Sequence, residues 1–362
     1  MRGSRRRSRG TWSTWVDNVS AGVRVPPETA LDRRRVVTLG GGHGQAVLLS
    51  ALTRLDLEVS AIVSVADDGG CSGELRRRAG MPPPGDLRRC LTALARRRRL
   101  AALYEERIPS PGSTSRSAGN LVLSLAYERL GSMQAAVDWA AAQLACAGRV
   151  IPVSEIPGTM QAYDAEGRVL SGESHIAAVA NAPVVVAVHG SGEASRAASE
   201  AITEADYLVF GPGSFFTSVL AVVSTPGVAP ACIASRGHSL LIANLAGEGR
   251  QTADWTLETY ARVLRDHLTI GSLGDVPSIE VLAHGSELGS GASLDDGTPV
   301  RFATLAPAGA SVHDPGLLAE ALCQWFGFRK DSGNRAANHQ EAETSAEESF
   351  RRDLAVALRQ LR

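Results

Sequence analysis

The sequence predicts an α/β fold, because strand-like runs alternate with glycine corners and helical patterns. Residues 36–39 and 63–66 are apolar, largely β-branched runs of strand length, and each stops in a loop rich in glycine. Between them, one side of a helical pattern collects Ala46, Val47, Leu49, Leu52 and Leu55. Strand, glycine turn, helix and strand form one half of a nucleotide-binding α/β unit.

The first corner reads Gly-Gly-Gly-His-Gly over residues 40–44. A chain that leaves a parallel strand and enters a helix presents free backbone N–H groups at the positive end of the helix dipole. Glycines allow positive φ and remove the Cβ atoms that would keep an anion away. The dinucleotide fingerprint is only partly met, because Gln45 stands where its third spaced glycine would fall. The corner therefore predicts either a phosphate site or no more than a tight turn.

Two adjacent carboxylates, Asp67 and Asp68, follow the second strand and precede Gly69 and Gly70. They would repel each other unless a metal, a ribose hydroxyl or a helix N-terminus compensates. One interpretation is an N-cap aspartate with a solvated neighbour. The other is a contact to ribose or Mg²⁺. We favour the second, because both loops should open onto the same edge of the sheet, where ligands bind in open α/β folds.

Composition limits the partners and the location that we expect. The net charge is −1, which gives no global field favouring nucleic acid or a membrane surface. No run approaches the ~18 apolar residues of a membrane span. Five scattered cysteines without C-x-x-C spacing predict neither a disulfide framework nor a zinc site, which fits a reducing cytosol. We therefore expect a cytoplasmic protein without membrane insertion or a nucleic-acid partner.

Three segments are expected along the 362 residues. Residues 1–34 are rich in arginine and lack the apolar core of a secretory signal, which predicts a disordered extension. Residues 35–328 carry the α/β pattern. Residues 329–362 turn polar and charged and form a tail with one helix over residues 346–361, which is helical only if its apolar stripe packs on something.

A rigid proline corner at residues 81–86 separates two predicted helices. The first is expected to begin at a Ser72 cap, and the second at Leu87 with Asp86 as its N-cap. Arg88 is therefore held in one place. It either clamps a phosphate or a carboxylate in bidentate fashion, or it lies on a solvated helix face paired with Asp86 or Glu74.

Further elements follow the same logic. Asn120 caps an apolar helix over residues 121–130, either as a plain N-cap or as a cap that also faces a ligand. The run 206–210 ends at Gly211, Pro212, Gly213 and Ser214 before a helix, which predicts a second anion contact. The remaining predicted elements are helices over 133–147, 194–204, 255–267 and 316–326, a hairpin over 160–169, a buried strand over 183–189, and strands over 149–153, 240–244, 278–281 and 300–305.

Several motifs now resemble one family in their order. They are Gly40–Gly44, Ala66 to Gly73, Pro82 to Arg88, Gly119-Asn120-Leu121, Gly172 to Ile176, and Gly211 to Ser214. Together they resemble the YvcK-like gluconeogenesis factor branch of the CofD superfamily over roughly residues 35–325. The resemblance implies a three-layer α/β domain with a largely parallel, Rossmann-like sheet.

The resemblance also implies a function. That branch is linked to growth on gluconeogenic carbon sources, cell shape and cell-wall precursor supply, and is thought to bind nucleotide sugars such as UDP-N-acetylglucosamine. The expectation is a UDP-sugar-binding regulatory protein, with a homo-oligomer left open. The alternative is the sister branch's activity, the Mg²⁺-dependent transfer of a phospholactyl group onto the deazaflavin Fo in coenzyme F420 synthesis. A dinucleotide-dependent oxidoreductase is the weakest hypothesis, because Gln45 spoils the fingerprint.

Carried over by resemblance, the ligand site would include both glycine corners, the aspartates and polar groups nearby: Gly41, Gly42, His43, Gly44, Asp67, Asp68, Arg88, Asn120, Gly211, Gly213 and Ser214. Asp67 and Asp68 would hold ribose or a metal, with Mg²⁺ as the metal considered. His43 replaces the threonine usual in the family, Cys71 the usual serine, and Arg116 the usual histidine. A protonated His43 could pair with phosphate, or it is a solvated substitution without a role.

Overall fold

The computed structural model describes residues 33–109, 115–179, 181–247, 251–270, 272, 274–286, 292–327 and 340–360. Residues from Arg34 onward form one compact unit. The predicted N-terminal extension lies outside the described residues, except for its last two positions. The strands are β1 (Arg35–Gly40), β2 (Glu58–Val63), β3 (Arg107–Ile108), β4 (Arg116–Ser117), β5 (Arg149–Pro152), β6 (Thr159–Tyr163), β7 (Val169–Ser171), β8 (Val185–His189), β9 (Tyr207–Phe210), β10 (His238–Ile242), β11 (Ile279–His284) and β12 (Val300–Ala303).

The helices alternate with these strands as an α/β fold requires. They are α2 (Gly42–Leu52), α3 (Gly70–Ala79), α4 (Gly85–Leu94), α5 (Arg98–Glu105), α6 (Ala118–Leu130), α7 (Met133–Leu144), α8 (Glu173–Ala178), α9 (Arg196–Thr203), a π-helical turn η1 (Phe215–Leu220), α10 (Ala221–Val223), α11 (Val228–Ala234), α12 (Leu257–Ile270), α13 (Pro315–Phe326) and α14 (Gln340–Gln360).

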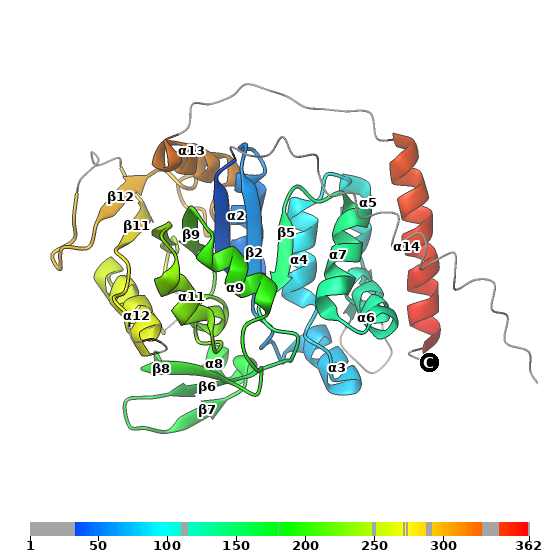
Figure 1. Ribbon diagram of the computed structural model, residues 1–362, viewed down its shortest axis with the longest axis horizontal. Helices are drawn as coiled ribbons and strands as arrows, with labels where there is room; N and C mark the ends of the chain where they lie inside the picture. Colours follow the sequence, from blue (N-terminus) through cyan, green and yellow to red (C-terminus); the bar gives the residue numbers. More distant parts are fainter. Residues whose placement is uncertain are drawn as a thin grey trace, which may run out of the picture. The chain divides into compact units, whose positions relative to one another are not determined.

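A seven-stranded sheet in the order β12-β11-β10-β9-β1-β2-β5 forms the middle layer (Figure 1). Each neighbouring pair of strands is parallel. Parallel strands are buried on both faces, which explains the continuous apolar run of β1. One core packs α2, α4 to α7 and α13 against one face of the sheet, and a second core packs α9 to α12 against the other. The three-layer Rossmann-like fold with a parallel sheet is confirmed.

The strand order fixes where a ligand site can form. From β1 the chain moves to β2 and then β5 on one side, and later places β9 on the other side of β1. The order therefore reverses at β1 and β9. In open α/β sheets the crevice at the carboxyl ends of the strands beside such a reversal is the ligand site. The corners after β1, β2 and β9 all belong to this crevice.

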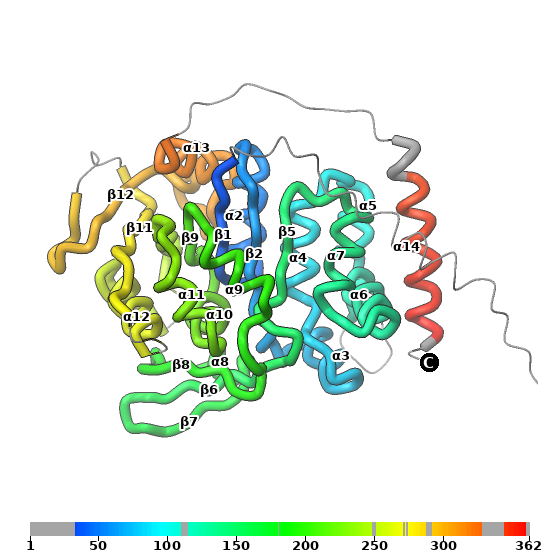
Figure 2. Tube along the Cα trace, in the orientation of Figure 1, coloured from blue at the N-terminus to red at the C-terminus, as the bar shows by residue number. Residues whose placement is uncertain are grey.

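Two smaller sheets add to this frame. A β3–β4 pair is antiparallel, and β7, β6 and β8 form an antiparallel three-stranded sheet that lies beside α8 (Figure 2). The predicted hairpin over 160–169 is confirmed as β6 and β7. The strand predicted as buried over 183–189 is β8, and this prediction was wrong in part. Its residues alternate between more and less buried, since only one face of the small sheet meets the core.

Three predicted helix caps were placed wrongly, each by two or three residues. Helix α3 is capped at Gly69 rather than Ser72, α4 at Pro84 rather than Asp86, and α6 at Ser117 rather than Asn120. The polar side chains at 72, 86 and 120 are therefore inside the first helical turns. There they are free to face the crevice instead of closing their own helix ends.

The helix predicted in the C-terminal tail is α14, which begins earlier than expected. Phe350 packs on Tyr104 of α5 with ring centroids 4.6 Å apart, and Arg129 of α6 pairs with Asp353 at 3.0 Å. The apolar stripe of α14 thus packs on the domain, which is the condition that we set for this segment to be helical. Among the described residues, no single helix is long and apolar enough to cross a membrane, whereas one bent pair, Phe215–Val223 with Val228–Ala234, passes by length and composition.

Candidate functional site

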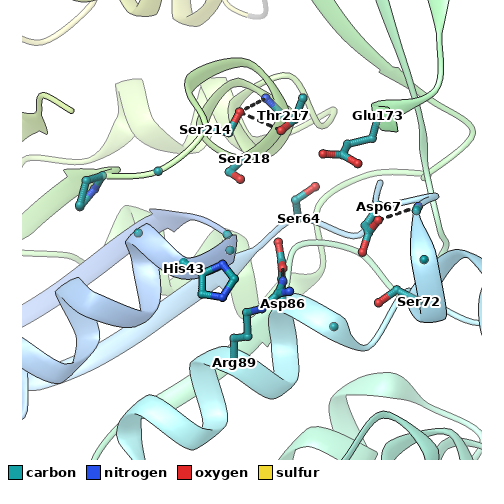
Figure 3. A pocket seen from close by; sticks show the side chains of 18 of the residues that line it. His43, Ser64, Asp67, Ser72, Asp86, Arg89, Glu173, Ser214, Thr217 and Ser218 are labelled. Carbon is teal, nitrogen blue, oxygen red and sulfur yellow. Dashed lines mark hydrogen bonds and ion pairs between the residues drawn. The ribbon is translucent and has the colours of Figure 1, made fainter. Parts of the chain in front are cut away.

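A cleft of about 750 Å³ opens at the carboxyl ends of the strands beside the reversal (Figure 3). Its walls come from the corners after β1, β2 and β9, the first turns of α3 and α4, the start of α8, and the segments 244–247 and 311–313. Clefts of 300 to about 1,000 Å³ accommodate small organic ligands. Nine of the predicted site residues line this cleft, namely Gly41, Gly42, His43, Gly44, Asp67, Arg88, Asn120, Gly213 and Ser214. The predicted residues Asp68 and Gly211 are not among its lining residues.

The N-terminus of α2 is the clearest anion-binding element of the cleft. No side chain caps this helix, whose N-cap residue is Gly41. The N–H groups of its first turn have no partner within the helix, and they carry the positive end of the helix dipole. Gly42 adopts φ of +67°, a conformation that favours glycine. A turn of this kind suits an anion, and the Asp86 carboxylate, which pairs with Arg89, lies against Gly41 at its start.

Gln45 explains why the third spaced glycine of a dinucleotide fingerprint is missing. Its side chain is fully buried, and its Nε2 donates to Thr38 Oγ1 at 3.0 Å. Its Oε1 accepts a bond from the Cys90 thiol. Gln45 therefore ties β1 to α4 inside the core and does not face the cleft.

The corner after β9 is already engaged with protein groups. The Gly213 N–H donates to Asn244 Oδ1 at 3.1 Å, and Asn244 Nδ2 donates back to the Gly213 carbonyl at 2.9 Å. Ser214 Oγ accepts from the Thr217 hydroxyl at 2.8 Å. This corner shapes the cleft wall, and its Gly213 amide, which we expected to bind phosphate, already has an acceptor.

The two aspartates separate instead of acting as a pair. Asp67 lines the cleft and accepts from the Gly69 N–H at 2.8 Å. Asp68 Oδ1 accepts from both the N–H and the hydroxyl of Ser174, at 3.0 and 2.7 Å. Within the described part of the chain, no three His, Cys, Asp or Glu side chains are arranged to hold a metal ion. The residues present do not fit a metal held jointly by Asp67 and Asp68.

Glu173 is a cleft residue that the site prediction missed. It is the first residue of α8, which places its carboxylate opposite Asp67 (Figure 3). Burial, followed by the charge of Asp67, raises the pKa of Glu173 to about 7, and the nearby Thr217 hydroxyl opposes the shift. Burial also raises the pKa of Asp67, and the charge of Asp86 adds to that shift. The Gly-Glu-Ser-His-Ile motif was the sequence signal, but nothing local shows that it reaches the cleft.

Arg88 does not lie on a solvated face. It is 3% exposed, its Nε donates to Asn120 Oδ1 at 2.9 Å, and its guanidinium pairs with Glu105. The expected partners are taken by neighbours, since Arg89 pairs with Asp86 at 2.6 Å and Arg116 with Glu74 at 2.5 Å. The Arg116–Glu74 pair also gives this departure from the family pattern a structural role. Arg88 therefore lines the cleft as a buried residue whose guanidinium is bonded to Asn120 and Glu105.

Asn120 is held by the same network. It is buried, and its Nδ2 donates to Cys71 Sγ at 3.6 Å while its Oδ1 accepts from Arg88. Asn120 is not the cap of its helix, which is Ser117, but it lines the cleft. His43, in contrast, is exposed, and its side chain lies at the edge of the cleft above Arg89 (Figure 3).

Two further polar side chains lie mostly buried in the cleft wall, His313 and Ser218. His313 is 7% exposed, and its Nε2 has no hydrogen-bond partner in the described structure. Burial lowers its pKa to about 4, and the Ala243 backbone opposes that shift, so the imidazole is uncharged at neutral pH. Ser218 is also 7% exposed and lines the cleft beside the first glycine corner, with no hydroxyl bond among the described residues. Buried polar atoms are normally satisfied, so His313 Nε2 is an unpaired acceptor in the cleft wall, whereas the Ser218 hydroxyl oxygen is not among the buried unpaired atoms.

Comparison with known proteins gives a consistent set of matches. The family model described as 2-phospho-L-lactate transferase CofD matches residues 36–287. The gluconeogenesis factor of Halalkalibacterium halodurans is 32% identical over 261 residues, which cover 71% of this chain and 80% of that protein. A Mycobacterium leprae protein, provisionally named a gluconeogenesis factor, is 36% identical over 304 residues, or 79% and 84% of the two chains.

Solved structures agree with the sequence matches. The crystal structure of a UPF0052 family member from Bacillus halodurans superposes with a TM-score of 0.72 and 28% sequence identity. The match covers 81% of this chain and 99% of that chain.

Proposed function

The chain belongs to the gluconeogenesis factor branch of the CofD family, and on that premise we propose that it is a regulatory protein that binds a nucleotide sugar, specifically a UDP sugar, in the cleft. In this proposal the protein acts in the cytoplasm and links the level of its ligand to carbon metabolism, cell shape and cell-wall precursor supply. These finer roles extend the family resemblance to this chain. The proposal assigns no bond breaking to the cleft.

One observation carries the proposal, namely the uncapped N-terminus of α2 that opens into the cleft at the strand-order reversal. Its free N–H groups and helix dipole suit a diphosphate. His43 and Arg89 lie on the same side of the cleft and supply donors and positive charge. The volume of about 750 Å³ leaves room on either side of a diphosphate for a nucleoside and a sugar.

The test is a thermal-shift and calorimetric titration of the full chain with UDP-N-acetylglucosamine. At a ligand concentration about 100 times the Kd, binding stabilises the folded state by about 2.7 kcal/mol, which raises the melting temperature by several degrees. Gly42→Asp should abolish the shift, because it places a carboxylate where the phosphate binds. Asp67→Ala should also abolish it, because Asp67 lines the cleft and would accept hydrogen bonds from hydroxyl groups of the ligand.

Gly42→Asn is the matched control, because Asn and Asp tolerate the positive φ of this position about equally and differ in charge. The Asn variant should keep part of the shift. If no UDP sugar stabilises the wild-type protein, the proposal is wrong.

The transferase named by the family model is the second candidate function. It is favoured by the match over residues 36–287. An assay with Fo, an activated nucleotide-linked phospholactate and Mg²⁺ distinguishes the two. Product formation with turnover, combined with no response to UDP sugars, would assign the protein to phospholactyl transfer.

A further inference from the structure

We propose that Glu173 determines the specificity of the cleft: together with Asp67 it accepts hydrogen bonds from the hydroxyl groups of a neutral sugar and excludes sugars that carry a carboxylate. This inference rests on the proposed function, because it assigns the half of the cleft that would hold the sugar.

The two sides of the cleft differ in chemistry. On one side, the start of α2 offers backbone donors, with His43 and Arg89 beside it (Figure 3). On the other side, Glu173 and Asp67 face each other across the cleft. Asp86 lies against the start of α2, where a Cβ on Gly41 would be 2.5 Å from its Oδ2, and it pairs with Arg89 at 2.6 Å. A ligand that spans the cleft must therefore combine an anionic group with a group rich in hydrogen-bond donors.

We assign the Glu173 and Asp67 carboxylates to hydroxyl groups of the ligand rather than to a metal ion. No three ligating side chains among the described residues are arranged for a cation. Ionised carboxylates act only as hydrogen-bond acceptors, and bonds from hydroxyl groups to them are short and strong. Neighbouring hydroxyls of a sugar are donors that suit two facing carboxylates.

Glu173 is held in place by contacts that lie outside the cleft. Asp68 accepts two bonds from Ser174, the next residue along α8, and Gln251 donates to the Ile176 carbonyl of the same helix. Gly69 also packs against this helix start, because a Cβ there would lie 3.0 Å from Ser174 Oγ and 4.0 Å from Glu173 Oε2. Asp68 thus positions the start of α8, and with it Glu173, although Asp68 itself does not line the cleft.

Ser218 supplies an observation that is independent of the carboxylates. Its hydroxyl lies near the first glycine corner, 3.5 Å from where a Cβ of Gly41 would be. It is more than nine-tenths buried, lines the cleft and makes no hydroxyl bond among the described residues. Its oxygen is not among the buried unpaired side-chain atoms, so the hydroxyl is accessible from the cleft and can donate to, or accept from, a bound ligand.

The charges around Glu173 set the expected selectivity. Three carboxylates act on it, from Asp67 and Asp68 after β2 and from Asp86 on α4. Thr217 of η1 is uncharged. Of the three arginines of α3, Arg76 donates to the Ala66 and Asp67 carbonyls and to Thr159. An anionic sugar would therefore meet like charge. Because the pKa of Glu173 is about 7, part of that repulsion should disappear on mild acidification.

The experiment compares UDP, UDP-glucose and UDP-glucuronate by calorimetry on the full chain at pH 8 and pH 6. At pH 8, UDP-glucuronate should bind at least about tenfold more weakly than UDP-glucose, a difference of about 1.4 kcal/mol. At pH 6 this ratio should shrink, because Glu173 takes up a proton. Using the ratio of the two sugars cancels any effect of pH on binding of the uridine diphosphate that both ligands share.

Glu173→Gln should remove most of the discrimination at pH 8, and Glu166→Gln on the exposed β6–β7 turn is the matched control. If the Glu173 variant does not fold, the pH dependence of the wild-type ratio still decides. Binding of UDP together with equal affinity for both sugars at both pH values would overturn this inference alone. Absence of binding by all three ligands would overturn the proposed function instead.

Discussion

Gly44 of α2 packs directly against the backbone of Gly213 after β9. A Cβ on Gly44 would lie 2.6 Å from Gly213 Cα and 2.4 Å from the Pro212 carbonyl oxygen. The corners that follow two neighbouring strands thus touch, backbone against backbone. This contact joins two cleft walls that are some 170 residues apart in the sequence.

Gly44→Ala should destabilise the protein, because backbone atoms cannot move aside as a flexible side chain can. We expect a loss of about 1–3 kcal/mol in the free energy of unfolding, measured with urea. Gly40→Ala is the control, since its Cβ would meet only the Gln45 side chain at 3.8 Å or more. Equal stability of the two variants would show that the corners are not in tight contact.

The stability of the protein should fall as pH rises through the range in which Glu173 ionises. Its pKa is raised from 4.5 to about 7 in the folded state, so between these values the folded protein binds more protons than the unfolded chain. The raised pKa of Asp67 acts in the same direction. Glu173→Gln should therefore be more stable than the wild type at pH 8, by about 1–3 kcal/mol, and this gain should vanish near pH 4.5.

Melting temperatures of both proteins across pH 4.5–8 provide the measurement, with Glu166→Gln as the control. If the melting temperatures of wild type and Glu173→Gln changed in parallel with pH, the folded protein would not disfavour the charged form of Glu173.

Arg88→Met should affect stability more than ligand binding. It removes a buried guanidinium and leaves Asn120 Oδ1 without its donor, which we expect to cost about 1–3 kcal/mol. Arg89→Met is the matched control, because that side chain is 27% exposed and pairs only with Asp86. Unchanged unfolding of Arg88→Met together with lost binding would instead identify Arg88 as a ligand clamp.

Phe350→Ala should loosen α14 from the domain. Phe350 is buried against Tyr104, and truncating a buried phenylalanine costs about 3–5 kcal/mol. Arg351→Ala, at an exposed neighbour on the same helix, should stay within about 0.5 kcal/mol of the wild type. Urea unfolding checks both values. A small loss for Phe350→Ala would show that α14 is a loosely attached tail.

The elements could be predicted because their signals are local. An apolar run followed by glycines marks β1 and β9 wherever they pair, and the helical periods follow from spacing alone. The second strand was placed too late, because β2 spans Glu58–Val63 and only the first residue of the predicted run over 63–66 belongs to it. Their order in the sheet depends on long-range pairing, so the position of β9 beside β1 could be expected only from the resemblance. Helix starts were missed because Ser72, Asp86 and Asn120 are good capping residues that tertiary contacts use for another purpose.

The site was predicted in part for the same reason. The glycine corner before α2 is defined by its own sequence, and it lies in the cleft as expected. Asp68 leaves the cleft because its partner, Ser174, lies 106 residues further along the chain. Arg88 likewise pairs with Glu105 of another helix, a contact that helix periodicity does not reveal. Glu173, Ser218 and His313 reach the cleft only through the folded arrangement of distant segments.

The most direct test of the central claim is a crystal structure of the protein with UDP-N-acetylglucosamine. The diphosphate should lie within hydrogen-bond distance of the backbone N–H groups at the start of α2, from Gly42 to Gly44, while Gly213 stays bonded to Asn244. A diphosphate bound away from that turn, or a ligand found outside the cleft, would contradict the account.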